Sequence, residues 1–150
     1  MDGDDKPRPK VVGSATEGAL ILMLRGGKWE TDYQAVRDMT FSASRDMQFP
    51  FNSTKKRSTV IIVDYEGKPK MVVKGASEVI FEDCTHFVDT DGETKPLDDG
   101  KRAEINGLIN AMAGRALRTL ALAHRSWDNV NDLPPDYRTN PPDSQEVSQD

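Results

Sequence analysis

Thr59-Val-Ile-Ile-Val-Asp-Tyr65 is followed by Glu66-Gly67-Lys68 and then by Lys70-Met-Val-Val-Lys74. The first stretch is rich in β-branched residues, which favour strands. The glycine of the middle segment is typical of a turn, and the second apolar stretch returns along the first. We therefore predict a β-hairpin over 59–74, with Gly75 ending its second strand. This hairpin indicates an antiparallel sheet.

The rest of the chain predicts further helices and strands without an internal repeat. Ser14 and Glu17 have the spacing of a capping box, with Ser14 as the N-cap of the first helix. We predict helices over 14–26, 29–38, 76–83 and 98–114, an extended edge segment at 47–51, a short hairpin around Asp91-Gly92 and a strand at 117–123. Hairpins joined to separate helices indicate an α+β fold with an antiparallel sheet. From residue 126 onward the chain is polar and proline-rich, which predicts a loop or tail.

Composition and charge narrow the class of protein. The chain has 150 residues and a single cysteine, Cys84, which fits one domain without an internal disulfide. No apolar run is long enough to cross a bilayer. The net charge of −5 speaks against a nucleic-acid partner. Residues 44–75 nevertheless carry seven Lys and Arg against three acids. Such a basic segment suits a small anionic ligand, although lysines on the edge of a solvated strand pair give the same pattern.

The sequence contains no familiar catalytic set. His86 and His124 lack the spacing of a metal site, so we expect no metal ligands. Gly26-Gly27-Lys28 is similar to the end of a phosphate-binding loop, but Leu22 stands where that loop needs its first glycine. No pair of nucleophile and base is apparent. We therefore predict no catalytic residues in this chain.

Four short segments, taken together, indicate a family. They are Gly13-Ser-Ala-Thr-Glu-Gly-Ala-Leu20, Phe49-Pro-Phe-Asn-Ser-Thr-Lys-Lys-Arg57, Val73-Lys-Gly-Ala-Ser-Glu78 and Ala116-Leu-Arg-Thr-Leu-Ala-Leu-Ala-His-Arg125. In content and order they resemble the nucleotide-binding domain of P-type ATPases. The segments 51–57 and 84–98 look most like the calmodulin-regulated calcium-transporting ATPases of plasma-membrane or vacuolar type. The resemblance covers residues 11–125 and leaves out the tail.

For four residues the resemblance implies contact with an adenine base. Phe51 matches the aromatic residue that stacks on the base, and the alternative is a core residue that shares a strand face with Phe49. Glu17 matches the acid that accepts a hydrogen bond from the adenine amino group, and its alternative is the capping box. Gly75 would admit the backbone close to the base, or merely end its strand. Leu120 matches the apolar neighbour of the base.

For three basic residues the resemblance implies a place in the same pocket. Lys56 and Lys74 match the lysines that line the pocket, and an exposed strand edge is the alternative for each. Arg118 matches the arginine that reaches the phosphates. Because Arg118 interrupts an apolar segment, 117–123, we expect this strand in the centre of the sheet and the guanidinium directed to the nucleotide cleft. The two lysines and Arg118 should then converge on that cleft.

The resemblance also implies a fold, a function and partners. The fold is that of a P-type ATPase N domain, a twisted antiparallel sheet flanked by helices, with the N-terminal part of the family domain missing. Residues 1–125 would form the truncated nucleotide-binding domain, and 126–150 the tail. The domain would hold ATP or ADP, with Mg²⁺ carried on the nucleotide. It would present ATP to the phosphorylation domain of a cation pump, with calcium as the cation and the actuator domain as a further partner.

The resemblance places this domain on the cytoplasmic side of an integral membrane protein. We expect the chain itself to be monomeric, without a nucleic-acid partner and without direct membrane contact. The Asp-Lys-Thr-Gly-Thr phosphorylation motif of the family does not occur in the sequence, so we expect no catalysis by this chain alone. Two other functions stay open: a stand-alone nucleotide hydrolase or transferase, and an interaction domain that no longer binds nucleotide.

Overall fold

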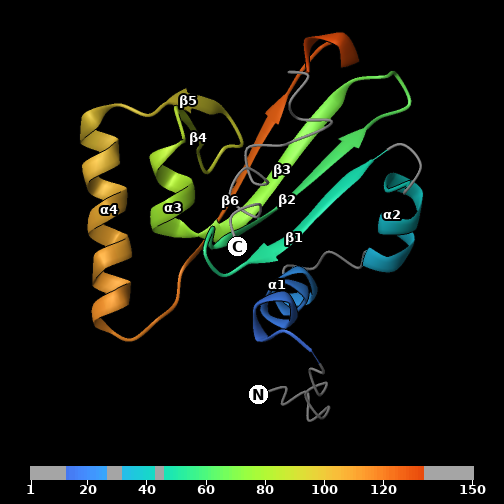
Figure 1. The fold of residues 1–150 in the computed structure, drawn as a ribbon. Helices are drawn as coiled ribbons and strands as arrows, with labels where there is room; N and C mark the ends of the chain where they lie inside the picture. The colour runs from blue at the N-terminus through green and yellow to red at the C-terminus, as the bar shows by residue number, and fades with distance from the viewer. Residues whose placement is uncertain (1–12, 27–31, 43–45, 134–150) are drawn as a thin grey trace, which may run out of the picture. The chain divides into compact units, whose positions relative to one another are not determined.

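The computed structural model describes residues 13–26, 32–42 and 46–133 (Figure 1). The chain divides into two compact units, residues 1–40 and residues 41–150. The first unit contains two helices among its described residues, and the second contains the sheet. No helix in the described parts of the chain is both long and apolar enough to span a membrane.

The first helix confirms its prediction. α1 (Ala15–Gly26) begins directly after Ser14, whose carbonyl oxygen accepts a hydrogen bond from the amide of Gly18 at 2.9 Å. Glu17 lies in the first turn of this helix, where an acid is favoured by the helix dipole. The spacing of Ser14 and Glu17 thus predicted where the helix starts.

The second helix lies further along the chain than predicted. α2 (Tyr33–Thr40) starts after the expected position, and Trp29 lies outside the described residues. The reason is Asp32, whose Oδ1 accepts hydrogen bonds from the amides of Gln34 at 3.0 Å and Ala35 at 3.2 Å. An aspartate at the N-cap satisfies amides that have no partner within the helix, so it fixes the helix start.

The second unit is built on a four-stranded antiparallel sheet in the order β1-β2-β3-β6 (Figure 1). Its strands are β1 (Met47–Asn52), β2 (Arg57–Val63), β3 (Pro69–Ala76) and β6 (Leu120–Ser126). The predicted hairpin is confirmed as β2 and β3, which lie in the middle of this sheet. The predicted extended segment is confirmed as the edge strand β1. The fold is therefore α+β, as expected.

Two predictions about the strands were wrong. β3 does not end at Gly75 but continues to Ala76, because Gly75 is still paired with Arg57 on one side and with Ala121 on the other. The segment 117–123 is not a central strand either. β6 starts only at Leu120 and forms the sheet edge opposite β1. An apolar run predicts a strand, but it does not determine which neighbours the strand pairs with.

The two faces of the sheet differ in burial. Residues paired directly across antiparallel strands point to the same face, so the registers sort the side chains. One face carries Thr59 and Ile61, which are 3% and 1% exposed. The other carries Val72, Leu120 and Leu122, which are 38%, 37% and 59% exposed. This second face, which we call the exposed face, therefore presents apolar side chains at the surface of the second unit.

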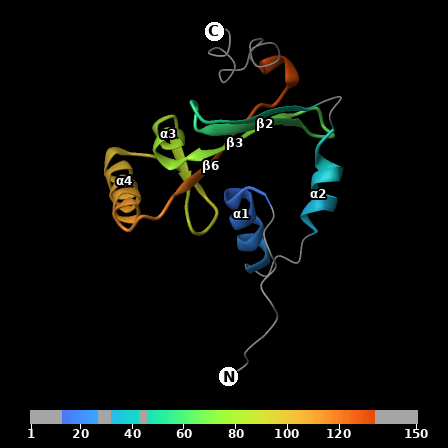
Figure 2. The same cartoon turned by 60° about the horizontal axis from the view of Figure 1, so that its bottom comes forward.

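Two helices and a small hairpin lie on the β3–β6 side of the sheet (Figures 1 and 2). They are α3 (Ser77–Glu82), β4 (His86–Val88), β5 (Thr94–Pro96) and α4 (Asp99–Gly114). α3 contacts β3, β6 and α4. These elements confirm the helices predicted at 76–83 and 98–114 and the hairpin predicted around Asp91-Gly92.

Arg102 ties α4 to the end of α3. Its guanidinium donates hydrogen bonds to the carbonyl oxygens of Phe81 at 3.0 Å and Cys84 at 2.7 Å. Carbonyl groups at a helix C-terminus have no partner within the helix, so Arg102 supplies donors where they are needed. Partial burial where α4 contacts the end of α3 raises the pKa of the Cys84 thiol.

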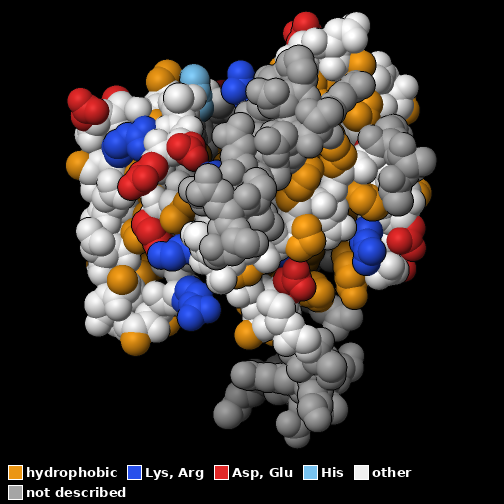
Figure 3. All heavy atoms as spheres, viewed as in Figure 1, with side chains coloured by type: hydrophobic (Ala, Val, Ile, Leu, Met, Phe, Trp, Pro, Cys, Tyr) orange, Lys and Arg blue, Asp and Glu red, His pale blue; other side chains and the backbone are white. Residues whose placement is uncertain are grey.

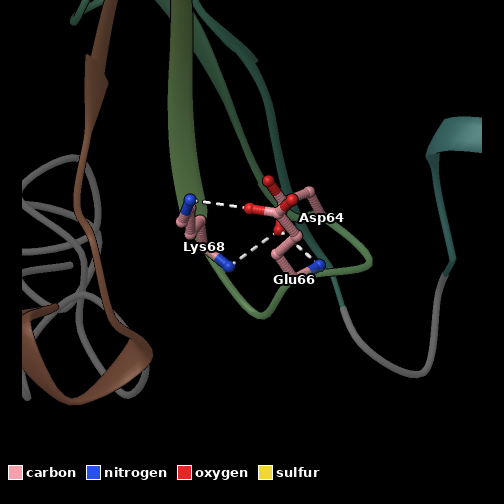
Figure 4. A network of polar contacts seen from close by, with 3 residues as sticks. All are labelled: Asp64, Glu66 and Lys68. Carbon is pink, nitrogen blue, oxygen red and sulfur yellow. Dashed lines mark hydrogen bonds and ion pairs between the residues drawn. The ribbon is translucent and has the colours of Figure 1, made fainter.

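Asp64 closes the turn between β2 and β3. Its Oδ1 accepts hydrogen bonds from the amides of Glu66 at 2.9 Å and Lys68 at 2.8 Å (Figure 4). The ammonium of Lys68 donates to the Glu66 carboxylate at 2.6 Å, and this hydrogen bond raises the pKa of Lys68. Gly67 has a φ of 80°, a conformation that glycine adopts at little cost. The predicted turn thus has its glycine where the backbone requires one.

Asp89 organises the turn between β4 and β5 in a similar way. Its Oδ1 accepts hydrogen bonds from the amides of Asp91 at 2.9 Å and Glu93 at 3.0 Å, and its carboxylate pairs with the ammonium of Lys95. The contact with Lys95, followed by the backbone amides, lowers the pKa of Asp89.

The chain continues past β6 in contact with the sheet. The amide of Trp127 donates a hydrogen bond to the carbonyl oxygen of Pro69 at 3.0 Å, and a short 3₁₀ helix follows at Val130–Asp132. Leu133 is only 5% exposed. The predicted tail therefore has a packed beginning, and residues 134–150 lie outside the described part of the chain.

Candidate functional site

Asn52 shapes the turn between β1 and β2, which carries Lys56 and follows Phe51. Its Oδ1 accepts hydrogen bonds from the amides of Thr54 at 2.8 Å and Lys55 at 3.2 Å. Its carbonyl oxygen accepts a further one from the amide of Lys56 at 2.7 Å. Asparagine is favoured in turns because its side chain can bond the backbone two residues on. The polar residues after Phe51 are typical of such a turn, but Asn52 was not identified from the sequence as the residue that organises it.

Phe51 is not a core residue. Its side chain is 63% exposed, whereas Phe49 is half-buried. The register of β1 and β2 shifts between Phe49, which pairs with Thr59, and Asn52, which pairs with Arg57. Such a β-bulge interrupts the regular alternation of side chains, so the expectation that the two phenylalanines share one face does not apply. Phe51 is left with an accessible ring at the sheet end.

Lys56 and Gly75 are held together by the backbone. Lys56 has a φ of 52°, in the left-handed region, and its carbonyl oxygen accepts a hydrogen bond from the amide of Ala76 at 3.0 Å. A β-carbon built on Gly75 would lie 2.5 Å from that oxygen and 2.8 Å from the β-carbon of Arg57. A glycine is therefore required here by the chain itself. The sequence alone did not reveal this reason.

Lys74 and Leu120 belong to the exposed face. Lys74 pairs with Ser58 on one side and with Leu122 on the other, and its side chain is half-buried. Leu120 pairs with Ala76, whose amide bonds the carbonyl of Lys56. The structure therefore brings Lys56, Gly75 and Leu120 to one end of the sheet. Phe51 lies at the same end, beside the β1–β2 turn, and Lys74 lies one residue further in.

Two predicted site residues lie apart from these elements. Arg118 is exposed and lies between α4 and β6, outside the sheet, so it does not interrupt a strand as expected. It precedes Leu120 by two residues, and its convergence with the lysines stays a prediction. Glu17 is exposed in α1 and belongs to the first unit, whereas the other site residues belong to the second. Its contact with adenine also stays a prediction.

Two acids, one in α3 and one directly after it, pair with basic residues at the start of β2 and in the turn before it. The ammonium of Lys56 lies 4.0 Å from the Glu78 carboxylate, and the guanidinium of Arg57 lies 3.2 Å from the Asp83 carboxylate. Acidic and basic side chains are interspersed over the side of the molecule that carries α3 and α4 (Figure 3). The described residues contain no group of three or more His, Cys, Asp or Glu side chains that could hold a metal ion.

Comparison with known proteins places the whole chain in one family model. The model is described as P-type ATPase, cytoplasmic domain N, and it matches residues 1–150. Among similar proteins is calcium-transporting ATPase 8, plasma membrane-type, of Arabidopsis thaliana. It is 37% identical over 116 residues, which cover 77% of this chain and 10% of that protein.

Two animal proteins show similar values. Plasma membrane calcium-transporting ATPase 4 of Homo sapiens is 35% identical over 133 residues, which cover 83% of this chain and 11% of that protein. Plasma membrane calcium-transporting ATPase 1 of Gallus gallus is 33% identical over 135 residues, which cover 83% of this chain and 11% of that protein. The chain thus spans about a tenth of the length of these relatives.

Proposed function

Since this chain belongs to the family of P-type ATPase cytoplasmic N domains, we propose that it is the ATP-binding module of a cation-transporting ATPase, with calcium as the cation. One observation carries the proposal for binding. The exposed ring of Phe51 lies at the same sheet end as Lys56 and Leu120, around a glycine that the backbone requires. An accessible aromatic ring at the same sheet end as an ammonium group suits a ligand with a flat base and a charged tail.

In this proposal the adenine base stacks on Phe51 and contacts Leu120. Stacking of a base on an aromatic side chain contributes about 1–3 kcal/mol in other nucleotide complexes. Lys56, Lys74 and Arg118 supply cations for the phosphates, because hydrogen bonds between charged partners are the stronger ones. The family resemblance also implies that Glu17 accepts a hydrogen bond from the adenine amino group, and this contact stays a separate prediction.

Mg²⁺ enters the proposed site on the nucleotide. Ammonium and guanidinium groups have no lone pair to offer a cation, so the basic residues fit phosphate oxygens and not the metal. Mg²⁺ commonly binds phosphate oxygens and keeps several waters. When bound, it would neutralise part of the phosphate charge. The chain's own residues bind and orient the nucleotide.

For the longer protein we propose a division of labour. Residues 1–125 form the nucleotide-binding domain, and a phosphorylation domain elsewhere in the polypeptide receives the phosphoryl group, with an actuator domain as a further partner. This chain then contributes orientation, which can lower a reaction barrier without any chemistry by the chain itself. In this proposal the domain lies on the cytoplasmic side of the membrane, and the chain alone does not hydrolyse ATP.

A titration with ATP, ADP and adenosine, followed by amide chemical shifts, tests the proposal. We expect shifts at residues 51–57, 73–76 and 118–120 and, from its predicted contact with adenine, at Glu17, with dissociation constants in roughly the high-micromolar to millimolar range. Absence of shifts with several millimolar nucleotide would contradict nucleotide binding and favour an interaction domain. Metal-dependent phosphate release by the pure chain would favour a stand-alone hydrolase.

A further inference from the structure

Glu78 lies beside a lysine of the proposed site although it belongs to a different element. It sits in the first turn of α3, and its Oε1 is 4.0 Å from the Nζ of Lys56. The two side chains are 60% and 56% exposed. Their proximity follows from the backbone, because the amide of Ala76 donates to the carbonyl oxygen of Lys56 at 3.0 Å. This bond keeps the start of α3 next to the β1–β2 turn.

We propose that Glu78 is a positioning residue that competes with nucleotide phosphates for Lys56, and so limits the preference of the site for ATP over uncharged adenosine. This inference rests on the proposed function. A carboxylate near the ammonium attracts it in the empty site and repels a phosphate brought to the same ammonium. ATP binding at Lys56 then has to displace or share this contact, whereas adenosine does not reach it.

Other acids of the same segment do not have this relationship with Lys56. Asp83 is engaged with the guanidinium of Arg57 at 3.2 Å. Glu82 is the last residue of α3, at the opposite end of the helix from Glu78. Exchange of Glu82 for glutamine changes the net charge equally, so it separates a local effect of Glu78 from a general effect of charge.

The size of the effect follows from exposure. Ion pairs between exposed side chains contribute about 0–1 kcal/mol, which corresponds to a change of up to about fivefold in an equilibrium constant. We therefore expect Glu78→Gln to bind ATP about two- to fivefold more tightly at low salt. ADP should gain less, and adenosine should bind as it does to the wild-type chain. Added salt should reduce the gain, because it screens exposed charges.

The experiment measures the affinities of ATP, ADP and adenosine for the wild-type 150-residue chain, for Glu78→Gln and for Glu82→Gln, at low and high salt. Glu78→Asp keeps the charge and withdraws the carboxylate, so its gain should be intermediate. In a Lys56→Gln background, Glu78→Gln should change nothing, because the competing ammonium is gone. Thermal unfolding shows whether each variant is folded. If Glu78→Gln does not fold, the ATP affinity of Glu78→Asp tests the competition in its place.

Several outcomes overturn the inference. Glu78→Gln could leave ATP binding unchanged or weaken it, which would mean that the carboxylate does not compete. An equal gain in Glu82→Gln, or an equal gain for adenosine, would show a general effect of charge or structure. A gain that persists in the Lys56→Gln background would show that Glu78 does not act through Lys56. If the wild-type chain binds no adenine nucleotide, the proposed function fails and the inference fails with it.

Discussion

A β-carbon on Gly75 would lie 2.5 Å from the carbonyl oxygen of Lys56. Lys56 lies in the turn between β1 and β2, whereas Gly75 lies in β3, and the backbone fixes the position of both clashing atoms. No change of rotamer could relieve it, so the β1–β2 turn would have to move away from β3. The position of Lys56 therefore depends on the absence of a side chain at residue 75.

Gly75→Ala should destabilise the chain by about 1–3 kcal/mol, as is usual when atoms are forced into a packed position. It should also weaken ATP binding, because the turn that carries Lys56 is displaced. Urea denaturation measures the first effect and a nucleotide titration the second. Gly107→Ala is the matched control, since a β-carbon there meets nothing within 4 Å. Because a helix interior favours alanine over glycine, this variant should gain up to about 1 kcal/mol in the free energy of unfolding. Wild-type stability of Gly75→Ala would contradict the prediction.

Phe51→Ala should weaken ATP, ADP and adenosine alike, by about 1–3 kcal/mol, because the proposed stack involves the base that all three share. The fold should survive, since the ring is 63% exposed. Isothermal titration gives the affinities, and denaturation gives the stability. Phe49→Ala serves as the comparison, because its half-buried ring should contribute to stability. Unfolding of Phe51→Ala, or normal binding by it, is the result that refutes this role.

Arg118→Ala should weaken ATP and ADP more than adenosine, because only the interaction with phosphates is removed. Added salt should likewise weaken ATP more than adenosine, since the screening length is about 10 Å or less at ordinary ionic strength. Stability should not change, because Arg118 is exposed and lies outside β6. Arg115→Ala removes the same charge from another exposed position nearby. Equal losses for adenosine and ATP would exclude a phosphate contact.

Asp89→Asn should destabilise the chain at neutral pH, because the asparagine cannot form the ion pair with Lys95. The folded chain lowers the pKa of Asp89, so its carboxylate stabilises the folded state above the ordinary aspartate pKa. This contribution is lost as the pH falls through the lowered value, below about 4. Thermal unfolding of both chains across this range should show a difference that disappears in acid. A difference that is the same at all pH values would contradict this account.

The sequence predicted the elements whose signals are local. The hairpin of β2 and β3 followed from β-branched runs around a glycine turn, and α1 followed from the spacing of Ser14 and Glu17. α2 was placed too early because the apolar spacing was given more weight than Asp32, whose carboxylate caps the helix. β6 was placed too early and in the centre of the sheet, because apolar content does not determine strand pairing.

The site was predictable only in part, for a related reason. The identities of its residues came with the family resemblance. That Lys56, Gly75 and Leu120 meet at one sheet end depends on two registers, which join segments far apart in the chain. The role of Gly75 depends on the left-handed conformation of Lys56, which a lysine rarely adopts. Neither property can be read from local sequence.

Because of the bulge in β1, the placement of Phe51 depends on the number of residues between Phe49 and Asn52. Substitution of Pro50 by another residue leaves the number of residues between Phe49 and Asn52 unchanged, so the shifted register can persist. Removal of one residue there would instead remove the bulge and restore regular alternation between Phe49 and Asn52, so the one residue left between them would point to the opposite face from both. This short segment should therefore tolerate changes of residue type far better than insertions or deletions. Its length, more than its chemistry, is what a designer of variants has to preserve.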